Sequence, residues 1–191
     1  ELEALDAHRV MFCCTKSRLA EVEKIAINLG DRVAGICDEA KIFVPLSAVE
    51  TARKMAKELC VDCLVSYGGG TAVGLAKAVA LEGGMPIICI VTTYSGSETT
   101  ALQGIIGYDG VRTNYHDIRM LPKVLIYDPE LMLDVPIRVS IASGFNSIAH
   151  AVSSYLGKDA NPVANMFSEN GIRVMSDALV QLAVDPHDLD A

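Results

Sequence analysis

The chain has 191 residues, of which 51% are hydrophobic and 21% are charged, and its formal net charge is −8. This composition permits a large core and argues against disorder, and an acidic chain without a Lys/Arg cluster argues against nucleic acid as a partner. Residues 1–9 lack the apolar segment of a secretory signal, and the longest fully apolar run, residues 85–91, is too short to cross a bilayer. We therefore expect a cytoplasmic globular protein that does not bind membranes.

The six cysteines fall mostly in apolar, strand-like runs. We expect buried free thiols in a reducing compartment. Cys60 and Cys63 have the CxxC spacing, but a zinc site needs a second ligand pair at matching spacing, which the sequence lacks. A redox motif opens a helix after a strand, whereas this pair closes a helix before a strand. We expect no function at this pair.

Apolar, β-type segments alternate with helix-like segments through the first half of the chain. The expected strands are residues 9–14, 32–37, 63–67 and 86–91. This repeated strand–helix–strand order predicts an α/β fold, with a Rossmann-like, mostly parallel sheet and helices on both faces. Ligands in such sheets bind at the carboxyl ends of the strands.

Three helices are expected between these strands. They cover residues 17–29, 47–59 and 71–82. Ser17 is the expected cap of the first helix, and Gly30 is its expected end. Ser47 and Glu50 have the spacing of a capping box for the second helix.

The most informative stretch joins the strand at 63–67 to the helix at 71–82 through Gly68, Gly69 and Gly70. Glycines let the backbone approach a ligand closely and reach φ > 0. The amide groups at the start of the next helix, with the positive end of its dipole behind them, favour a phosphate. A tight turn that binds nothing is the alternative, but three consecutive glycines in this position favour phosphate binding.

A second polar segment follows the strand at 86–91. Residues 92–100 contain six Ser and Thr side chains and one carboxylate. They form either a polar surface loop or a set of donors for the phosphate and nicotinamide region of a cofactor. Because this segment and the glycine turn both follow strands, we expect them to face one cleft. A less regular stretch then leads to Tyr108 and a turn at Asp109–Gly110, and residues 121–129 look like a further strand.

After Pro136 the pattern is helical and lacks strand signals. We therefore expect a dinucleotide-binding domain over residues 1–136 and the first part of an all-α domain over residues 137–191. Asn161 is the expected cap of a helix there, with a proline after it. Apolar side chains in residues 144–184 are expected to form an incompletely covered face.

Asn146 and His150 are four residues apart in this helical part, so they share one helix face. One alternative is a buried pair whose side chains only hydrogen-bond. The other is a functional pair.

Four segments in order resemble the iron-containing alcohol dehydrogenase superfamily. They are GGGTAVGLAKAVAL, PIICIVTTYSGSE, LPKVLIYDP and SGFNSIAHAVSSY. Within the superfamily the chain looks more like maleylacetate reductases, because Gly74 and Asn146 stand where many of the alcohol dehydrogenases have Asp. The resemblance covers nearly the whole chain and implies a chain truncated at both ends.

The resemblance implies a cofactor site at the ends of the strands and on the segment after them. Its residues would be Thr15, Gly69, Gly70, Thr71, Thr92, Thr93, Ser97 and Arg112. The glycines and Thr71 would hold the pyrophosphate, and the residues from Thr92 would line the nicotinamide end. Arg112 occupies the place of a cofactor-contacting Lys, and Thr15 lies at the position beside the adenosine ribose.

The cofactor implied is NADH or NADPH. A carboxylate near the ribose selects NADH in nucleotide-binding sheets. Here the matching position holds Thr15, which Lys16 follows, and the segment from Cys13 to Ala20 contains no carboxylate. We therefore expect both cofactors to be accepted.

The activity implied is reduction of maleylacetate, a small dicarboxylate, to 3-oxoadipate in the degradation of aromatic compounds, by a homodimer in the full-length form. Asn146 and His150 match the first two of four metal-ligand positions in metal-dependent relatives. We expect no metal, because a neutral amide is a poorer ligand than a carboxylate. Asn146 and His150 would instead stabilise the enolate oxygen, and His150 would deliver a proton. The alternatives are a metal-dependent alcohol dehydrogenase and a non-catalytic nucleotide-binding fragment.

Overall fold

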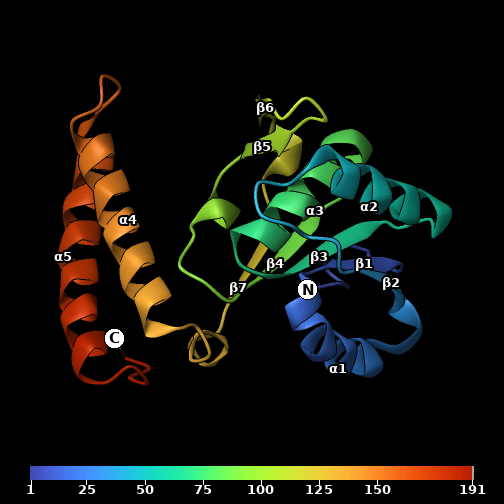
Figure 1. Ribbon diagram of the computed structural model, residues 1–191, viewed down its shortest axis with the longest axis horizontal. Helices are drawn as coiled ribbons and strands as arrows, with labels where there is room; N and C mark the ends of the chain where they lie inside the picture. Colours follow the sequence, from blue (N-terminus) through green and yellow to red (C-terminus); the bar gives the residue numbers. More distant parts are fainter. Residues whose placement is uncertain (191) are drawn as a thin grey trace. The chain divides into compact units, whose positions relative to one another are not determined.

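The computed structural model describes residues 1–190 and contains a central sheet of five parallel strands (Figure 1). The spatial order is β2–β1–β3–β4–β7. The bounds are β1 Val10–Cys13, β2 Val33–Cys37, β3 Cys63–Gly68, β4 Ile87–Val91 and β7 Val124–Tyr127. Every residue of β1 and β3 is buried, which explains why these strands appear in the sequence as continuous apolar runs. The predicted parallel α/β sheet is confirmed.

Helices cover both faces of this sheet, as predicted. They are α1 Leu19–Leu29, α2 Leu46–Glu58 and α3 Gly70–Gly83. In Figure 1, α1 lies on one face, and α2 and α3 lie on the other. Short 3₁₀ turns join the elements of this part: η1 Lys16–Arg18, η2 Gly30–Arg32, η3 Ser97–Thr99 and η4 Ile118–Met120.

The predicted caps of the first two helices are wrong. The chain leaves β1 through η1, so α1 starts only at Leu19, and the Ser17 hydroxyl lies 2.9 Å from the Thr15 hydroxyl instead of capping a helix. In α2 the cap position is Pro45, and Ser47 lies inside the helix. The proline side chain has no hydrogen-bond acceptor, so α2 begins without a side-chain cap.

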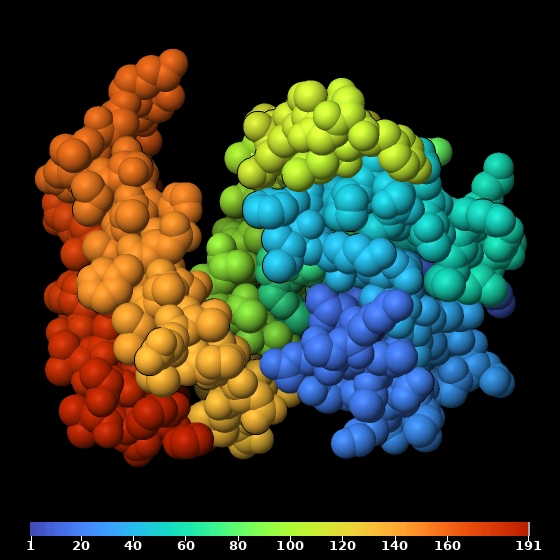
Figure 2. All heavy atoms as spheres, in the orientation of Figure 1, coloured from blue at the N-terminus to red at the C-terminus, as the bar shows by residue number. Residues whose placement is uncertain are grey.

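A two-stranded antiparallel hairpin replaces the irregular stretch that the sequence suggested. It consists of β5 Leu102–Ile106 and β6 Arg112–His116, and the predicted turn at Asp109–Gly110 connects them. All residues of β6 are exposed, so its sequence lacks the apolar alternation that marks a strand. Figure 2 shows the hairpin, in yellow-green, over the segment near Val44, whose carbonyl accepts a hydrogen bond from the Ile106 amide at 3.2 Å.

The chain forms two compact units. The first holds residues 1–92 and 96–127, and the second holds residues 93–95 and the chain from Asp128 onward. The second unit contains η5 Pro129–Met132 and the helices α4 Ile137–Tyr155 and α5 Pro162–Val184. The functional division at Pro136 stays a prediction.

Close packing joins α4 to α5 in the second unit. Gly144 of α4 is buried, and a Cβ atom there would lie 2.7 Å from the Leu179 Cδ2 atom of α5, so a larger residue would require the Leu179 side chain to move. The predicted cap of α5 is confirmed, because the Asn161 side chain accepts hydrogen bonds from the amides of Val163 and Ala164.

The cysteines behave as buried free thiols, with Cys60 as the exposed exception. Burial raises the pKa of Cys63 to about 12, so this thiol stays protonated and unreactive at neutral pH. Within residues 1–190, the helices are too short or too polar to span a bilayer.

Candidate cofactor site

The glycine turn joins the central strand β3 to α3. Gly68 ends β3 with φ +138°, a backbone conformation that residues with a side chain rarely adopt. Gly69 occupies the cap position of α3 and provides no side-chain cap. The first amide groups of a helix lack partners within the helix. At the start of this 14-residue helix they therefore form a cradle for an anion. The predicted residues Gly69, Gly70 and Thr71 all lie in this turn.

The second polar segment begins directly beside this turn. Gly68 pairs with Val91 in the sheet, and the Thr92 amide donates to the Gly68 carbonyl at 3.2 Å. Thr92 is buried. The two segments are therefore adjacent at Gly68 and Thr92, and the expectation that they face one cleft stays a prediction. Thr93 belongs to the second unit.

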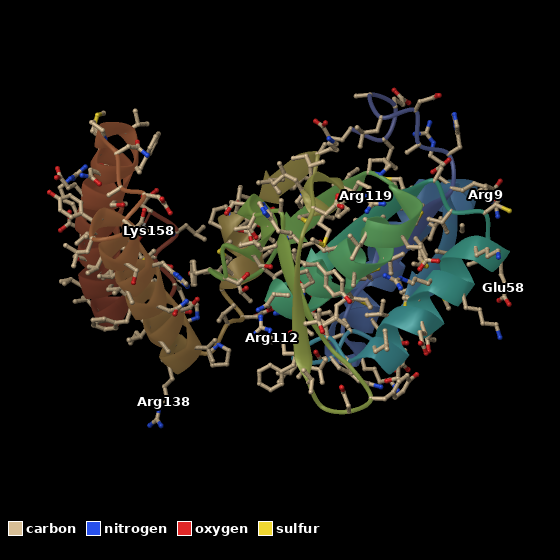
Figure 3. The ribbon with its side chains drawn as sticks, turned by 90° about the horizontal axis from the view of Figure 1, so that it is seen from above. Arg9, Glu58, Arg112, Arg119, Arg138 and Lys158 are labelled. Atoms are coloured by element: carbon tan, nitrogen blue, oxygen red, sulfur yellow. The ribbon has the colours of Figure 1, made fainter. Side chains whose placement is uncertain are left out.

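Ser97 and Arg112 line one cavity of the first unit. The cavity has a volume of about 370 Å³, and its other lining residues are Leu102, Gln103, Gly104 and Asn114. Arg112 comes from β6, on the hairpin visible in Figure 3, and its guanidinium group lies over Gly104, where a Cβ atom would be 2.1 Å from Nε. A guanidinium and two amide side chains at one cavity suit an anionic or strongly polar ligand.

Gly74 explains in physical terms why the hairpin lies so close to α3. A Cβ atom at Gly74 would be 2.7 Å from Val44 Cγ2 and 2.9 Å from Gln103 Oε1. An Asp at this position would therefore displace Gln103, which lines the Arg112 cavity. The single glycine that set this sequence apart from many alcohol dehydrogenases also shapes the cavity.

Thr15 follows β1 at the edge of the sheet where the strands have their carboxyl ends, and it forms an isolated bridge with Glu39. Glu39 follows β2, and its carboxylate lies 2.7 Å from the Lys41 Nζ atom and 3.8 Å from the Lys16 Nζ atom. The hydrogen bond from Lys41 lowers the pKa of Glu39, so this carboxylate is charged. The segment from Cys13 to Ala20 contains no carboxylate, but Glu39 from the segment after β2 lies beside Thr15 in the fold. The expectation that both cofactors are accepted did not take this carboxylate into account and stays a prediction.

Sequence reasoning missed two residues in this region. Glu39 was detectable, because an acidic residue after the second strand is a known ribose partner in nucleotide-binding folds. Lys77 was detectable as the one charged side chain in residues 70–81, within a helix that is otherwise apolar on every side.

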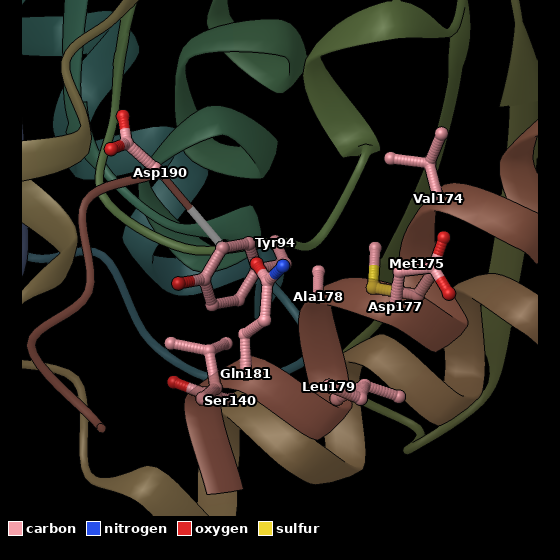
Figure 4. Close-up of a pocket in the computed structure, with 10 residues that line it drawn as sticks. Tyr94, Ser140, Val174, Met175, Asp177, Ala178, Leu179, Gln181 and Asp190 are labelled. Atoms are coloured by element: carbon pink, nitrogen blue, oxygen red, sulfur yellow. The ribbon is translucent and has the colours of Figure 1, made fainter. Parts of the chain in front are cut away.

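Asn146 and His150 lie on α4 of the second unit, and both are exposed. The buried, hydrogen-bonded pair that the sequence left open is therefore not formed. A cavity of about 390 Å³ lies in this unit. Its lining includes Tyr94, Ser140 and residues of α5 such as Met175 and Gln181 (Figure 4). Asn146 and His150 do not line it.

The sequence of this chain matches the family model described as iron-containing alcohol dehydrogenase over residues 1–129. The chain belongs to this family. The match includes the glycine turn, the Thr92 segment and the hairpin with Arg112.

Several proteins match all or nearly all of the chain. A protein named maleylacetate reductase from Burkholderia cepacia is 43% identical over 191 residues, which cover 100% of this chain and 54% of the relative. A protein of the same name from Sphingobium indicum is 39% identical over 96% of this chain and 52% of its own length. The crystal structure of maleylacetate reductase from Agrobacterium tumefaciens superposes with a TM-score of 0.96 at 37% identity, over 99% of this chain and 54% of that one. The chain thus spans about half the length of the relatives it matches.

The family description names iron, so the expectation that no metal is bound gains no support from this membership. Among residues 1–190, no group of three or more His, Cys, Asp or Glu side chains could hold a metal ion. The amide of Asn146 and the imidazole of His150 fall short of the donor set that an iron ion requires. The described residues therefore do not fit a complete metal site.

Proposed function

We propose that this protein is an NAD(P)H-dependent oxidoreductase that reduces maleylacetate to 3-oxoadipate in the degradation of aromatic compounds. The observation that carries the proposal is the 43% identity to a maleylacetate reductase along the entire chain. The start of α3, which lies within the three-glycine turn and has no side-chain cap, supports the cofactor class because it suits a pyrophosphate.

The first unit supplies the cofactor-binding residues in this proposal. Backbone amides of Gly69, Gly70 and Thr71 bind the pyrophosphate, and Thr92, at the end of β4, lies beside them. Arg112 supplies a positive charge at the cavity that it shares with Ser97. Thr93 and Thr15 complete the set by resemblance to relatives. The nicotinamide cofactor, when bound, supplies the hydride.

Asn146 and His150 of the second unit act on the substrate in this proposal. Hydride addition to a carbon–carbon double bond conjugated to a ketone places negative charge on the ketone oxygen. Amide and imidazole N–H groups stabilise such an enolate oxygen by hydrogen bonding. An imidazole can also deliver a proton near neutral pH. His150 is therefore the proposed donor of the proton that the enolate takes up at the carbon next to its carbonyl group.

The test is a spectrophotometric assay of the complete gene product with maleylacetate and either NADH or NADPH. We expect substrate-dependent oxidation of both cofactors. A preparation that binds the cofactors but leaves maleylacetate unreduced contradicts the substrate assignment, and one that binds neither contradicts the cofactor class.

A metal-dependent alcohol dehydrogenase is the second candidate, because the family description names iron. Asn146 argues against it, since an amide oxygen is a weaker ligand than a carboxylate. Elemental analysis and an alcohol-oxidation assay of the same preparation separate the two. Stoichiometric iron or zinc together with alcohol oxidation favours the second candidate. Cofactor binding without either reaction favours a non-catalytic nucleotide-binding protein.

The exposed apolar side chains of the second unit support association of the complete protein, for which we propose a homodimer. Phe145 and Met166 are 62% and 69% exposed, as predicted, although Leu179 is buried between the helices. Such a surface favours contacts with other protein segments. Light scattering on the complete gene product measures the assembly, and a monomer contradicts the proposed dimer.

A further inference from the structure

Lys77 is a buried cation in the middle of α3. It exposes none of its surface, and its neighbours on the helix are Ala, Val and Leu residues that form the core. Burying an ammonium group costs free energy unless acceptors surround it. A lysine persists at such a position only where its three N–H donors find partners.

All three donors of Lys77 find partners in one short segment. The Nζ atom donates to the Ser97 carbonyl oxygen, to the Thr100 hydroxyl oxygen at 3.0 Å and to the Leu102 carbonyl oxygen at 3.1 Å. The segment therefore wraps around the ammonium group from η3 to the start of β5. Hydrogen bonds to a charged group are among the stronger ones in proteins.

Two ionisable side chains lie near this ammonium group. Glu98 is buried and accepts a hydrogen bond from the Tyr127 hydroxyl at 3.0 Å. Glu98 and Cys89 of β4 both interact electrostatically with the Lys77 ammonium group. Burial lowers the pKa of Lys77 to about 8, and Cys89 and Glu98 act in the opposite direction. The segment from Ser97 to Leu102 is thus held by the buried Lys77 ammonium group as well as by the hydrogen bonds of η3.

We propose that Lys77 is a positioning residue that fixes the Ser97–Leu102 segment to the helix of the glycine turn. Helix α3 starts at the turn that would hold the pyrophosphate, and its third turn carries Lys77. Ser97, whose carbonyl Lys77 binds, lines the cavity that contains Arg112. One helix therefore sets the positions of both parts of the cofactor site. The consequence for cofactor binding rests on the function proposed above.

Replacement of Lys77 by Met in the complete gene product tests this role. Met fills a similar volume without donors, so the Ser97 and Leu102 carbonyls lose the hydrogen bonds that they accept from Lys77. We expect amide hydrogen exchange in residues 96–103 of the cofactor-free protein to rise about tenfold or more, as loss of hydrogen bonds to a charge implies. We expect the Kd values of NADH and NADPH to rise by a similar factor, with kcat changed less than KM for the cofactor.

Val79→Ala is the matched control. Val79 is buried on the same helix but lines a separate cavity with Arg53 and Met85. This variant loses core packing and global stability, so it shows how a packing defect in α3 alone affects exchange and cofactor Kd. We expect exchange in residues 96–103 and cofactor Kd close to the unmodified values. Thr100→Val removes one acceptor of Lys77 and replaces the Met variant as the test if that variant fails to fold. We expect amide exchange in residues 96–103 and the cofactor Kd to rise about threefold in this variant.

The outcomes separate this inference from the proposed function. If the unmodified protein binds neither cofactor, the proposed function fails, and the exchange experiment alone still tests the anchoring of the segment. If the unmodified protein binds cofactor and the Lys77→Met and Thr100→Val variants match Val79→Ala in both exchange and Kd, Lys77 is a structural residue only and the inference is overturned.

Discussion

The two units hold their proposed functional residues in opposite ways. In the first, the glycine turn ends a fully buried strand, Thr92 is tied to it through the sheet, and Lys77 fixes the next segment from within the core. In the second, Asn146 and His150 are exposed on one helix. The first unit thus contains a preformed cradle, whereas the second presents side chains without fixing them. Binding and chemistry should therefore respond separately to mutation.

The largest expected effect comes from closing the cradle with Gly69→Val. The backbone at Gly69 has φ −90° and ψ −161°, which valine adopts, so the fold should survive while the side chain blocks close approach of a phosphate. We expect the Kd of NADH to rise about a hundredfold or more. Gly171→Ala is the control, because its Cβ atom meets open space. Unchanged NADH affinity in a folded Gly69→Val protein would contradict cofactor binding at the glycine turn.

Replacing His150 by Ala tests whether the second unit acts in catalysis without contributing to cofactor binding. If the second unit acts in catalysis only, kcat should fall about a hundredfold, the usual scale for loss of an acid–base group, while the Kd of NADH stays the same. Asn146→Ala should lower kcat in the same way. Isothermal titration and steady-state kinetics on the same samples separate the effects. A parallel loss of cofactor affinity would show that the two functions are not separable.

Lys77 gives the first unit a specific pH dependence of stability. Because its pKa is lowered from 10.5 to about 8 in the fold, the folded protein binds fewer protons than the unfolded chain between these values. The cost of burying the charge is fully present below about pH 8 and is relieved as the pH rises. The free energy of unfolding of the unmodified protein should rise relative to Lys77→Met by on the order of 2 kcal/mol between about pH 7 and pH 10.

Urea unfolding of both proteins at several pH values measures this difference. The raised pKa values of Cys89 and the other buried thiols affect both proteins, so the comparison largely removes their contribution. A difference that stays constant or falls with pH would contradict the buried, charged state of Lys77.

The smallest expected effect concerns cofactor choice at Thr15. Lys16 and Lys41 both face Glu39, so this edge carries charges of both signs and should discriminate weakly. We expect kcat/KM for NADH and NADPH to differ by less than about tenfold. Thr15→Asp should then favour NADH, and Glu39→Gln should shift the ratio toward NADPH. A hundredfold preference in the unmodified protein, or no shift in either variant, would refute this reading of the edge.

The sequence predicted the parts of the fold that depend on local patterns. Continuous apolar runs marked the buried strands, and Asn161–Pro162 marked the start of α5, because each signal arises within a few residues. The hairpin was missed because β6 is exposed along its whole length and is held by pairing with β5. The Ser17 and Ser47 caps were wrong because tertiary connections, through η1 and Pro45, set where the helices begin.

The candidate site divides along the same line. The placement of Gly69 to Thr71 and of Thr92 after neighbouring strands was predictable, because strand ends in a parallel sheet converge at one edge. The contact of Glu39 with Lys16 and the role of Lys77 were not predictable, because both depend on segments that are far apart in sequence. The roles of Asn146 and His150 stay predictions.

The central claim is that the first unit binds a nicotinamide cofactor at the glycine turn. Hydrogen-exchange footprinting of the complete gene product with and without NADH tests it most directly, because exchange reports individual backbone amides. The account predicts that NADH slows exchange at residues 69–73 and 92–100, with little change along α5. Saturating NADH that leaves the glycine turn unprotected, or that protects only the second unit, would contradict it.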